Sequence, residues 1–374
     1  MVFEVTPWNV KGKVNYEKLI KEFGIKTITP ELLDKIKKHT RDLHIFLKRG
    51  VFFAHRDLDW ILNKYKNGEK FYLYTGRGPT ESMHIGHLVP MMFTKWLQEK
   101  FKTKVYLQFT DDEKFLFKKH LKLEKIESFT RENIIDILAL GFNEKNTIVI
   151  QDTKHINYLY EEAIKVSRIV TFSMVKATFG LKDSSNIGQI FYTSLQTVPA
   201  FLESKIQGKN VPCLIPLGVD QDPHFRITRD VAPKLGYYKP AIIHSKFMPS
   251  LRGDDKMSSS KPEACIFLTD DEETVKRKVW RALSGGGGTL REHKEKGGNP
   301  EKCIIFKYLY SIFEEDDNKI EEIREGCRTG RTMCGECKEL LTEKINKFLK
   351  EHRKRRKRVE KKVEKYFIDN KIKL

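Results

Sequence analysis

Two short motifs bring together residue types that bind phosphate, and the first of them follows a hydrophobic run. Residues 84–87 read His-Ile-Gly-His and stand at the start of a helical pattern. The N-terminus of a helix offers unpaired backbone N–H groups and the positive end of the helix dipole, which suit phosphate oxygens. Gly86 allows close approach of a nucleotide, and two imidazoles can donate hydrogen bonds. By itself the motif is only suggestive, because incidental surface histidines would look the same.

The second motif is Lys-Met-Ser-Ser-Ser at residues 256–260, in a loop that begins at Gly253. An ammonium and several hydroxyls on a mobile loop can reach the β- and γ-phosphates of a nucleotide while a transition state forms. A flexible polar linker is the alternative. The order of the two motifs, one after the first strand of a series and one after the last, favours a joint nucleotide site.

The elements that position these motifs alternate between strand and helix. Residues 71–74 have strand composition and end at a turn signal over residues 75–79. Helical patterns separate this run from further predicted strands at 105–109, 147–150, 213–217 and 241–243. Such alternation predicts βαβ units, and therefore an α/β fold with a Rossmann-like, doubly wound parallel sheet.

The chain divides into three predicted regions. Residues 1–69 carry short helical patterns and are interpreted as an N-terminal extension without visible chemistry, whereas residues 70–268 hold the sheet and both motifs. After residue 268 the strand signal disappears, and residues 269–374 are predicted to form an α-helical domain. Its last long helix contains the densest basic stretch of the chain, at residues 350–362.

Composition limits the class of protein and its partners. The 374 residues are 39% hydrophobic and 32% charged, which fits a soluble globular protein and excludes disordered and multi-span membrane classes. No secretion or import signal is recognisable, and six cysteines do not make a disulfide scaffold, so we expect a cytoplasmic protein with reduced thiols. Lys and Arg exceed Asp and Glu by 70 to 51, a net charge of +19. This excess favours a polyanionic partner, although a lysine-rich solvated surface is an equal alternative.

The two motifs resemble the HIGH and KMSKS signatures of class I aminoacyl-tRNA synthetases. The stretches TGRGPTESMHIGHLVPMMFTKWLQ, QFTDDEKFLFK, LIPLGVDQDPHFRITRDVAPKLGY and KMSSSKPEACIFLTD are similar to the eukaryotic and archaeal branch of the tryptophanyl-tRNA synthetases, and the similarity covers nearly the whole chain. The pattern departs at Ser259, where the signature has a second lysine. The resemblance implies activation of L-tryptophan with ATP and Mg²⁺ to tryptophanyl-adenylate, followed by transfer to tRNA(Trp). It also implies a homodimer, with the dimer surface near residues 150–200.

The resemblance assigns roles to particular residues. The groups expected at the phosphates, and counted as catalytic, are Arg77, His84, His87 and Lys256. The wider ATP site would comprise Gly76, Arg77, Gly78, His84, Gly86, His87, Gly218, Asp220, Gln221, Lys256, Met257 and Ser258. The tryptophan site would comprise Tyr74 and Gln108 at the indole N–H, with Glu113, Gln196 and Gln221 at the ammonium. A buried indole N–H needs an acceptor, and an ammonium needs a carboxylate.

Three further expectations concern the helical region and rival functions. In the basic stretch, Arg353, Arg355, Arg356 and Arg358 are interpreted as tRNA phosphate contacts, with a solvated helix face as the alternative. No structural zinc is expected, because only Cys334 and Cys337 show a two-residue spacing beside Cys303, Cys327 and His352. The rival functions are a tyrosyl-tRNA synthetase, a nucleotidylyltransferase that does not act on tRNA, and a catalytically silent RNA-binding paralogue.

Overall fold

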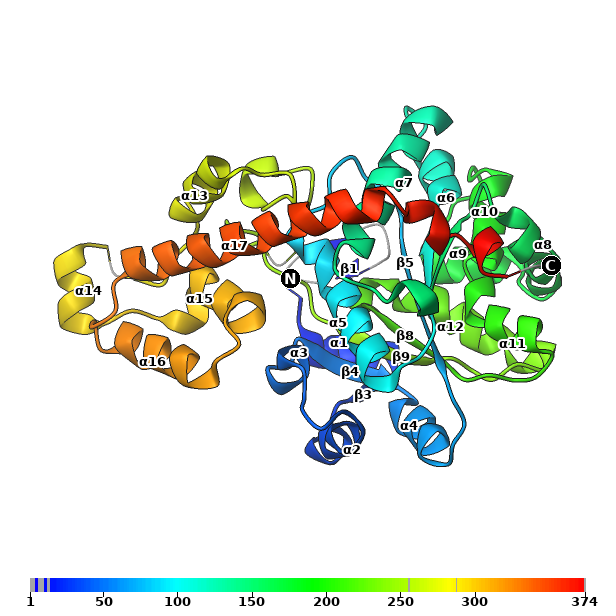
Figure 1. Ribbon diagram of the computed structural model, residues 1–374, viewed down its shortest axis with the longest axis horizontal. Coiled ribbons are helices and arrows are strands. Elements are labelled where there is room, and N and C mark those ends of the chain that lie inside the picture. Colours follow the sequence, from blue (N-terminus) through cyan, green and yellow to red (C-terminus); the bar gives the residue numbers. More distant parts are fainter. Residues whose placement is uncertain (1–3, 6–9, 12–13, 255, 287, 373–374) are drawn as a thin grey trace.

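A seven-stranded sheet occupies the centre of the larger part of the molecule (Figure 1). The computed structural model describes residues 4–5, 10–11, 14–254, 256–286 and 288–372. In spatial order the strands of the sheet are β3 (Lys26–Thr27), β4 (Phe52–Arg56), β9 (Ala241–Ser245), β8 (Cys213–Gly218), β5 (Tyr72–Arg77), β6 (Val105–Phe109) and β7 (Thr147–Gln151). A separate two-stranded ribbon consists of β1 (Glu4–Val5) and β2 (Val10–Lys11).

The five strands from β9 to β7 are parallel, and they confirm the predicted α/β fold. One boundary differs from the prediction, because β5 continues through Arg77 instead of ending at a turn after Tyr74. The extra residues pair with the end of β6, with Thr75 opposite Leu107 and Arg77 opposite Phe109. Residues 75–77, predicted as part of a turn, therefore belong to the strand, and Arg77 is the last residue of β5.

Strands β3 and β4 come from the predicted N-terminal extension and were missed in the sequence. They run antiparallel, with β3 paired to β4 and β4 paired to β9. The sheet is therefore mostly parallel with an antiparallel edge, and it extends beyond the predicted range 70–268. Within the extension, residues 1–3, 6–9 and 12–13 lie outside the described residues.

Helices cover both faces of the sheet. Leu73, Leu107 and Ile243 point to one face and pack in the same core as α4 and α5, whereas Tyr74 and Ile215 point to the other. Alternate residues of a strand face opposite sides, so each strand supplies both cores. The helices around the sheet are α1 (Tyr16–Phe23), α2 (Pro30–Thr40), α3 (Ile45–Lys48), α4 (Leu58–Lys66), α5 (Ile85–Phe101), α6 (Asp111–Phe117), α7 (Leu123–Leu138), α8 (Ile156–Ser167), α9 (Phe172–Phe179), α10 (Ile187–Leu195), α11 (Leu202–Gln207) and α12 (Asp222–Val231).

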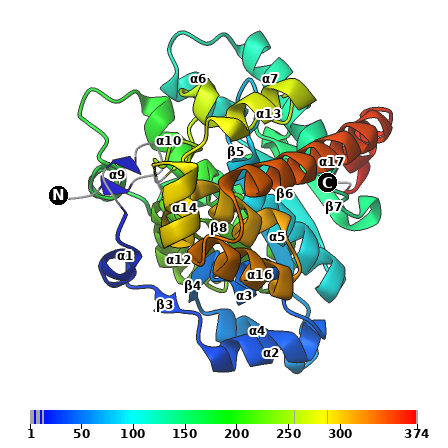
Figure 2. The same cartoon turned by 90° about the vertical axis from the view of Figure 1, so that its left-hand side faces the viewer.

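Beyond Leu268 the chain is helical, as predicted, and forms a lobe beside the sheet (Figures 1 and 2). The lobe consists of α13 (Glu272–Trp280), α14 (Leu290–Lys296), α15 (Ile304–Tyr308), a π-helical turn at Leu309–Phe313, α16 (Asp317–Arg328) and α17 (Cys334–Glu360). Helix α14 was missed because Ser284 and the following glycines obscure its start. Thr289 caps it by accepting a hydrogen bond from the Glu292 N–H at 3.1 Å.

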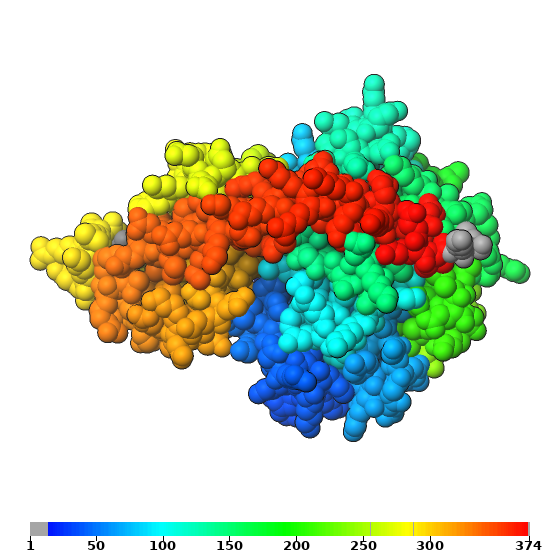
Figure 3. Space-filling model, in the orientation of Figure 1, coloured from blue at the N-terminus to red at the C-terminus, as the bar shows by residue number. Residues whose placement is uncertain are grey.

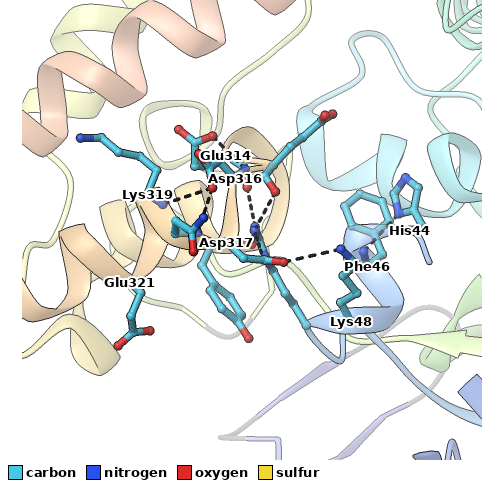
Figure 4. Close-up of polar contacts among 12 residues, drawn as sticks. His44, Phe46, Lys48, Glu314, Asp316, Asp317, Lys319 and Glu321 are labelled. Carbon is cyan, nitrogen blue, oxygen red and sulfur yellow. Dashed lines mark hydrogen bonds and ion pairs between the residues drawn. The ribbon is translucent and has the colours of Figure 1, made fainter. Parts of the chain in front are cut away.

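The lobe is joined firmly to the sheet part. Helix α17 runs from the lobe onto α7 and forms a continuous surface ridge (Figure 3). A second junction lies at α3, where Lys48 faces Asp317 with 3.5 Å between Nζ and Oδ2 (Figure 4). There the buried Arg49 guanidinium donates to the carbonyl of Tyr310 at 2.5 Å and to Asp317 Oδ1 at 2.7 Å. These contacts fix the lobe relative to the nucleotide motifs.

Candidate active site

A cavity of about 350 Å³ opens at the carboxyl ends of β5 and β8. In open α/β sheets ligands bind at this edge, where neighbouring strands send their connections to opposite faces. Of the residues predicted at the ATP and amino-acid sites, those that line the cavity are Gly76, Arg77, Gly78, His84, Gly86, His87, Glu113, Gln196, Gly218, Asp220, Gln221, Lys256 and Met257. Residues of both motifs therefore line one cavity, although 168 residues of chain lie between His87 and Lys256.

The charges of the cavity suit an anion. Among its described lining residues, the cationic side chains are Arg77, Lys114, Lys118, Lys246 and Lys256, and the carboxylates are Glu113 and Asp220. Clefts lined by one sign of charge concentrate ligands of the opposite sign. A polyphosphate is therefore the ligand class that the cavity favours.

The His-Ile-Gly-His motif stands at the start of α5, as predicted. His84 is the N-cap residue, and its ring stacks on that of His87 with 3.4 Å between centroids. Neither ring nitrogen of the buried His84 has a hydrogen-bond partner among the described residues. Gly86 lies close to both motifs, because a Cβ there would be a tight 3.2 Å from His84 Nδ1 and in ordinary contact, at 3.5 Å, with the Met257 Cβ. The unpartnered imidazole faces the region that a ligand would fill.

Both imidazoles are neutral near neutral pH. Burial, and then the Arg77 cation, lowers the pKa of His84 to about 3. The same two causes place the pKa of His87 well below its ordinary value. Arg77 contacts His87 directly, with Nη2 3.1 Å from each ring nitrogen. A neutral imidazole carries one N–H, so each ring can donate one hydrogen bond to a phosphate oxygen.

Two residues of the Lys-Met-Ser-Ser-Ser motif, Lys256 and Met257, line the same cavity. Lys256 Nζ is 2.7 Å from Asp220 Oδ2 and 5.0 Å from the centre of the Phe247 ring. Met257 is buried, and its backbone N–H donates to the carbonyl of Met248 at 2.9 Å. Ser258 is exposed, does not line the cavity, and shares a 2.9 Å hydrogen bond with Ser260. Of the predicted loop contacts, the structure thus brings Lys256 and Met257 to the cavity and leaves Ser258 outside it.

Backbone hydrogen bonds tie this loop to the first motif. The Ile85 N–H donates to the carbonyl of Ile266 at 3.0 Å, and the Leu268 N–H donates to that of Met83 at 2.9 Å. His84 and Phe267 also form an isolated antiparallel bridge. The segment that follows the Lys-Met-Ser-Ser-Ser motif is therefore bonded to the start of α5. These contacts fix the positions of the two motifs relative to each other.

The predicted indole contacts, Tyr74 and Gln108, are not among the residues that line the cavity. Tyr74 and Gln108 are fully buried and bonded to each other, with 2.5 Å between the Tyr74 hydroxyl and Gln108 Oε1. Gln196 Nε2 donates to the Tyr74 hydroxyl at 3.1 Å, and Gln196 Oε1 accepts from Tyr192 at 2.6 Å. The three predicted residues thus form one buried polar network, with Gln196 connecting it to the cavity.

Asp152 is part of this network and was missed in the sequence. Both of its carboxyl oxygens lie 2.9 Å from Gln108 Nε2. The contact fixes the Gln108 amide with its nitrogen toward Asp152 and its oxygen toward Tyr74. Burial, and then the neighbouring Asp112, raises the pKa of Asp152 well above its ordinary value. Its position in the sequence could have identified Asp152, because it directly follows β7, just as Thr110 and Asp111 follow β6 at the same edge of the sheet.

The four basic-stretch arginines do not share one environment. Arg356 forms ion pairs with Asp136 and Glu132 of α7, and Arg353 donates to the carbonyl of Asp270 at 3.1 Å. Arg355 is half-buried, whereas Arg358 is exposed. Two of the predicted tRNA contacts are therefore engaged in holding α17 against its neighbours. Helix position alone could not show this, because the acidic partners are more than 200 residues away in the sequence.

Among the described residues, no three His, Cys, Asp or Glu side chains are already assembled as a metal site. None of the helices described is long and apolar enough to cross a membrane.

Comparison with known proteins agrees with this geometry. Residues 66–350 match the family described as tRNA synthetases class I (W and Y). The chain is 51% identical over 372 residues to the tryptophan–tRNA ligase of Saccharolobus solfataricus, covering 99% of this chain and 96% of that protein. It is also 51% identical to the ligase of Thermococcus onnurineus, over 97% of this chain and 94% of the relative.

Solved structures give the same result. A tryptophanyl-tRNA synthetase from Plasmodium falciparum superposes with a TM-score of 0.90 at 42% identity, covering 96% of this chain and 98% of the other. A second, from Encephalitozoon cuniculi and bound to tryptophan, superposes with a TM-score of 0.89 at 36% identity, covering 96% and 99% of the two chains.

Proposed function

Because the chain belongs to the tryptophan–tRNA ligases of archaeal and eukaryotic type, a family of class I synthetases, we propose that its cavity is where tryptophan and ATP react. The observation that carries the proposal is the convergence of both phosphate-binding motifs on a cationic cavity whose floor is a buried polar network. The first product is tryptophanyl-adenylate, and the final product is tryptophanyl-tRNA.

The proposed chemistry has two steps. A carboxylate oxygen of tryptophan attacks the α-phosphorus of ATP, the bond from that phosphorus to the bridging oxygen breaks, and pyrophosphate leaves. The terminal ribose hydroxyl of tRNA(Trp) then attacks the acyl carbon and releases AMP. Neither step requires a covalent bond to the protein or a zinc ion. The contribution of the chain is therefore positioning and stabilisation of charge.

The phosphates would lie between the two motifs. Arg77 supplies a permanent cation at the end of β5, and the neutral imidazoles of His84 and His87 supply N–H donors at the start of α5. Lys256 lines the same cavity and contacts Asp220 in this structure. For Lys256 to reach pyrophosphate oxygens, its ammonium has to leave Asp220, so this exchange belongs to the activation step.

Mg²⁺ would accompany ATP in this scheme. The cavity carboxylates described are Glu113 and Asp220, and Asp220 already has a cationic partner. The ion would therefore be held mainly by phosphate oxygens, as is common for Mg²⁺. When bound, it neutralises part of the charge on those oxygens.

Tryptophan would lie with its indole toward the buried network. The Tyr74 and Gln108 oxygens are fully buried next to Gln196, which lines the cavity, and a remaining acceptor lone pair of this pair would suit the indole N–H. Glu113, Gln196 and Gln221 line the same cavity and would face the ammonium group. A phenol both donates and accepts, so the same site would pair tyrosine less completely.

Two surfaces extend the proposal beyond small substrates. Arg358, on the exposed side of α17, is a candidate contact for tRNA phosphates. The other surface lies on α8 and its neighbours, where Ile156, Tyr160 and Ile164 expose 37%, 53% and 46% of their area at helical spacing, beside Ile187 at 84%. An apolar stripe of this kind suits a subunit interface, and we propose a homodimer there, acting in the cytoplasm.

The decisive experiment is ATP–pyrophosphate exchange with tryptophan, with tyrosine and without amino acid, followed by aminoacylation of tRNA(Trp). We expect exchange with tryptophan alone and acylation that depends on tRNA. Exchange with tyrosine would contradict the assignment of the Tyr74–Gln108 pair to indole. Absence of exchange with both amino acids would reject the proposed reaction at this cavity.

A further inference from the structure

Four of the six cysteines meet in the helical lobe, although 34 positions separate the first from the last. Cys303 is the N-cap of α15, Cys327 lies near the end of α16, and Cys334 and Cys337 belong to the first turn of α17. Cys303 and Cys327 are buried, and all four thiols are free. The fold thus collects cysteines from three helices around the glycine-rich segment that starts at Ser284.

A histidine lies between two of these thiols. A Cβ built on Gly286 would be 2.6 Å from Cys334 Sγ and 3.2 Å from His293 Nδ1. A Cβ on Gly298 would be 2.9 Å from Cys327 Sγ and 2.7 Å from His293 Cε1. The sulfurs of Cys327 and Cys334 therefore both lie near the imidazole edge that carries Nδ1 and Cε1. Two glycines leave this space open, where any larger residue would displace a sulfur or the ring.

The hydrogen bonds of His293 leave one nitrogen unused. Nε2 lies 3.0 Å from the carbonyl oxygen of Thr332, which assigns the ring proton to Nε2. Nδ1 then presents a lone pair, and within the described part of the chain it has no hydrogen-bond partner although the residue is only 3% exposed. A histidine that donates one N–H to a backbone carbonyl and directs the other nitrogen to an ion is a common arrangement in metal sites.

Two of the lobe thiols are also affected by the charge state of other cysteines of the lobe. Burial, and then Cys303 and Cys334, raises the pKa of Cys327 to about 11. Burial, and then Cys303, Cys327 and Cys334, raises the pKa of Cys337 to about 12. The mutual influence of these thiols agrees with their position in one pocket. A thiophilic cation would displace the thiol protons on binding.

We propose that Cys303, Cys327, Cys334 and Cys337, with His293 beside them, form a binding site for a thiophilic metal centre. The centre would be either Zn²⁺ held by four of these five groups or an iron–sulfur cluster held by the four thiolates, since sulfur-rich sites take both. The side chains are not assembled at coordination distances among the described residues. Binding therefore draws the thiols inward and releases one proton from each thiol that ligates.

This proposal revises the expectation of no structural zinc. The sequence shows a single two-residue spacing, Cys334 to Cys337, and structural zinc sites usually show two. The other groups come from different helices, so their approach depends on tertiary packing. His293 replaces His352 as the neighbouring histidine, because His352 Nε2 lies 2.9 Å from the carbonyl of Asp136, on α7.

The site would connect the parts of the lobe. It joins α14, through His293, to the starts of α15 and α17 and to the end of α16, where the Gly298 N–H already donates to the carbonyl of Cys327 at 2.7 Å. A metal centre here would stabilise the lobe relative to its unfolded state. The adenylation cavity contains none of these groups, so amino-acid activation is a separate readout.

The test is metal content of the full chain purified without oxygen. We expect either one zinc per chain, or iron with acid-labile sulfide and visible absorption. Cys327→Ser should lose the metal and lower the melting temperature, whereas the control Cys213→Ser, in β8 outside the cluster, should retain the metal. ATP–pyrophosphate exchange with tryptophan should persist in Cys327→Ser, which establishes that the variant is folded. If that variant does not fold, His293→Ala serves as the second variant, with reduced metal affinity expected.

Two outcomes would overturn the proposal. One is wild-type protein that holds neither metal, does not bind added Zn²⁺, and has thiols that react freely with a thiol reagent. The other is equal metal content in wild type and Cys327→Ser. Failure of pyrophosphate exchange in wild type would instead contradict the proposed function, so the two proposals are tested apart.

Discussion

The ammonium of Lys256 lies 2.7 Å from Asp220 Oδ2, so the loop cation that should meet pyrophosphate is already paired with a carboxylate at the end of β8. The Lys256 side chain is 38% accessible and can be reached by a ligand, whereas the Asp220 side chain is only 9% accessible. A strong anion can therefore take the lysine from Asp220. The pair holds the loop near the cavity before the phosphates arrive.

Removal of Lys256 should affect the chemical step more than binding. In Lys256→Ala we expect kcat of tryptophan-dependent pyrophosphate exchange to fall by roughly a hundredfold, the usual loss for one group that stabilises transition-state charge. The KM for tryptophan should change little. Lys261→Ala is a matched control, because Lys261 is on the same loop but pairs with Asp254 outside the cavity. Equal losses in the two variants would contradict a role in charge stabilisation.

Asp152 should control how well the pocket binds tryptophan. In Asp152→Ala, Gln108 loses the partner of its amide nitrogen and can turn, which presents a donor where the indole needs an acceptor. We expect the KM for tryptophan to rise by about tenfold or more, since an unmatched buried polar group costs about 1–3 kcal/mol. Asp152→Asn retains an oxygen toward Gln108 and should lose less. An unchanged KM in Asp152→Ala would show that Gln108 is oriented by other contacts.

Acid should destabilise the fold through buried histidines. Burial is the first cause that lowers the pKa of His44, His55 and His224 to about 4 and that of His84 to about 3. Below about pH 6.5 these histidines bind protons in the unfolded chain but stay neutral in the folded chain. The free energy of unfolding therefore falls as the pH decreases from about 6.5 toward 4. Each histidine contributes at most about 1.4 kcal/mol per pH unit. Urea unfolding at several pH values should show this slope, reduced in His84→Gln. A flat profile would contradict the buried neutral state.

Arg356 and Arg358 should separate structural from tRNA-binding roles on α17. Arg356→Ala breaks the ion pairs with Asp136 and Glu132 and should lower the free energy of unfolding by about 1–3 kcal/mol. Arg358→Ala should leave stability unchanged, weaken tRNA binding and reduce the salt slope by about one. Thermal melts and filter binding at several salt concentrations measure the two effects. Unchanged tRNA affinity in Arg358→Ala would remove this residue from the proposed contact surface.

The apolar stripe on α8 should control assembly. Ile164 exposes 46% of its area beside Tyr160, and a carboxylate there would be buried without a partner in a dimer. We expect wild type to sediment as a dimer and Ile164→Glu as a monomer at the same concentration. Leu290→Glu is the control, because Leu290 is 64% exposed on α14 in the helical lobe. Equal masses for wild type and both variants would contradict a dimer interface at α8.

Local signals were enough for much of the fold and for the phosphate motifs. The strands β6 to β9 and the start of α5 follow from runs of neighbouring residues, because composition and periodicity act over one turn or one strand. His84 and Gly86 could be assigned for the same reason, since their role depends on position at a helix start. The family resemblance then supplied Tyr74 and Gln108, which no local pattern distinguishes from ordinary polar residues.

Tertiary structure decided what depends on residues far apart in the chain. Strand β4 exists because β9 pairs with it, and Asp152 matters because Gln108 lies beside it across the sheet edge. Arg356, predicted as a tRNA contact, is paired because α7 supplies its carboxylates. The lobe cysteines show a single two-residue spacing in the sequence, and packing brings Cys327 and Cys334 next to His293. Such contacts have no local signal, because the free energy that forms them comes from long-range burial and pairing and not from the residues next in sequence.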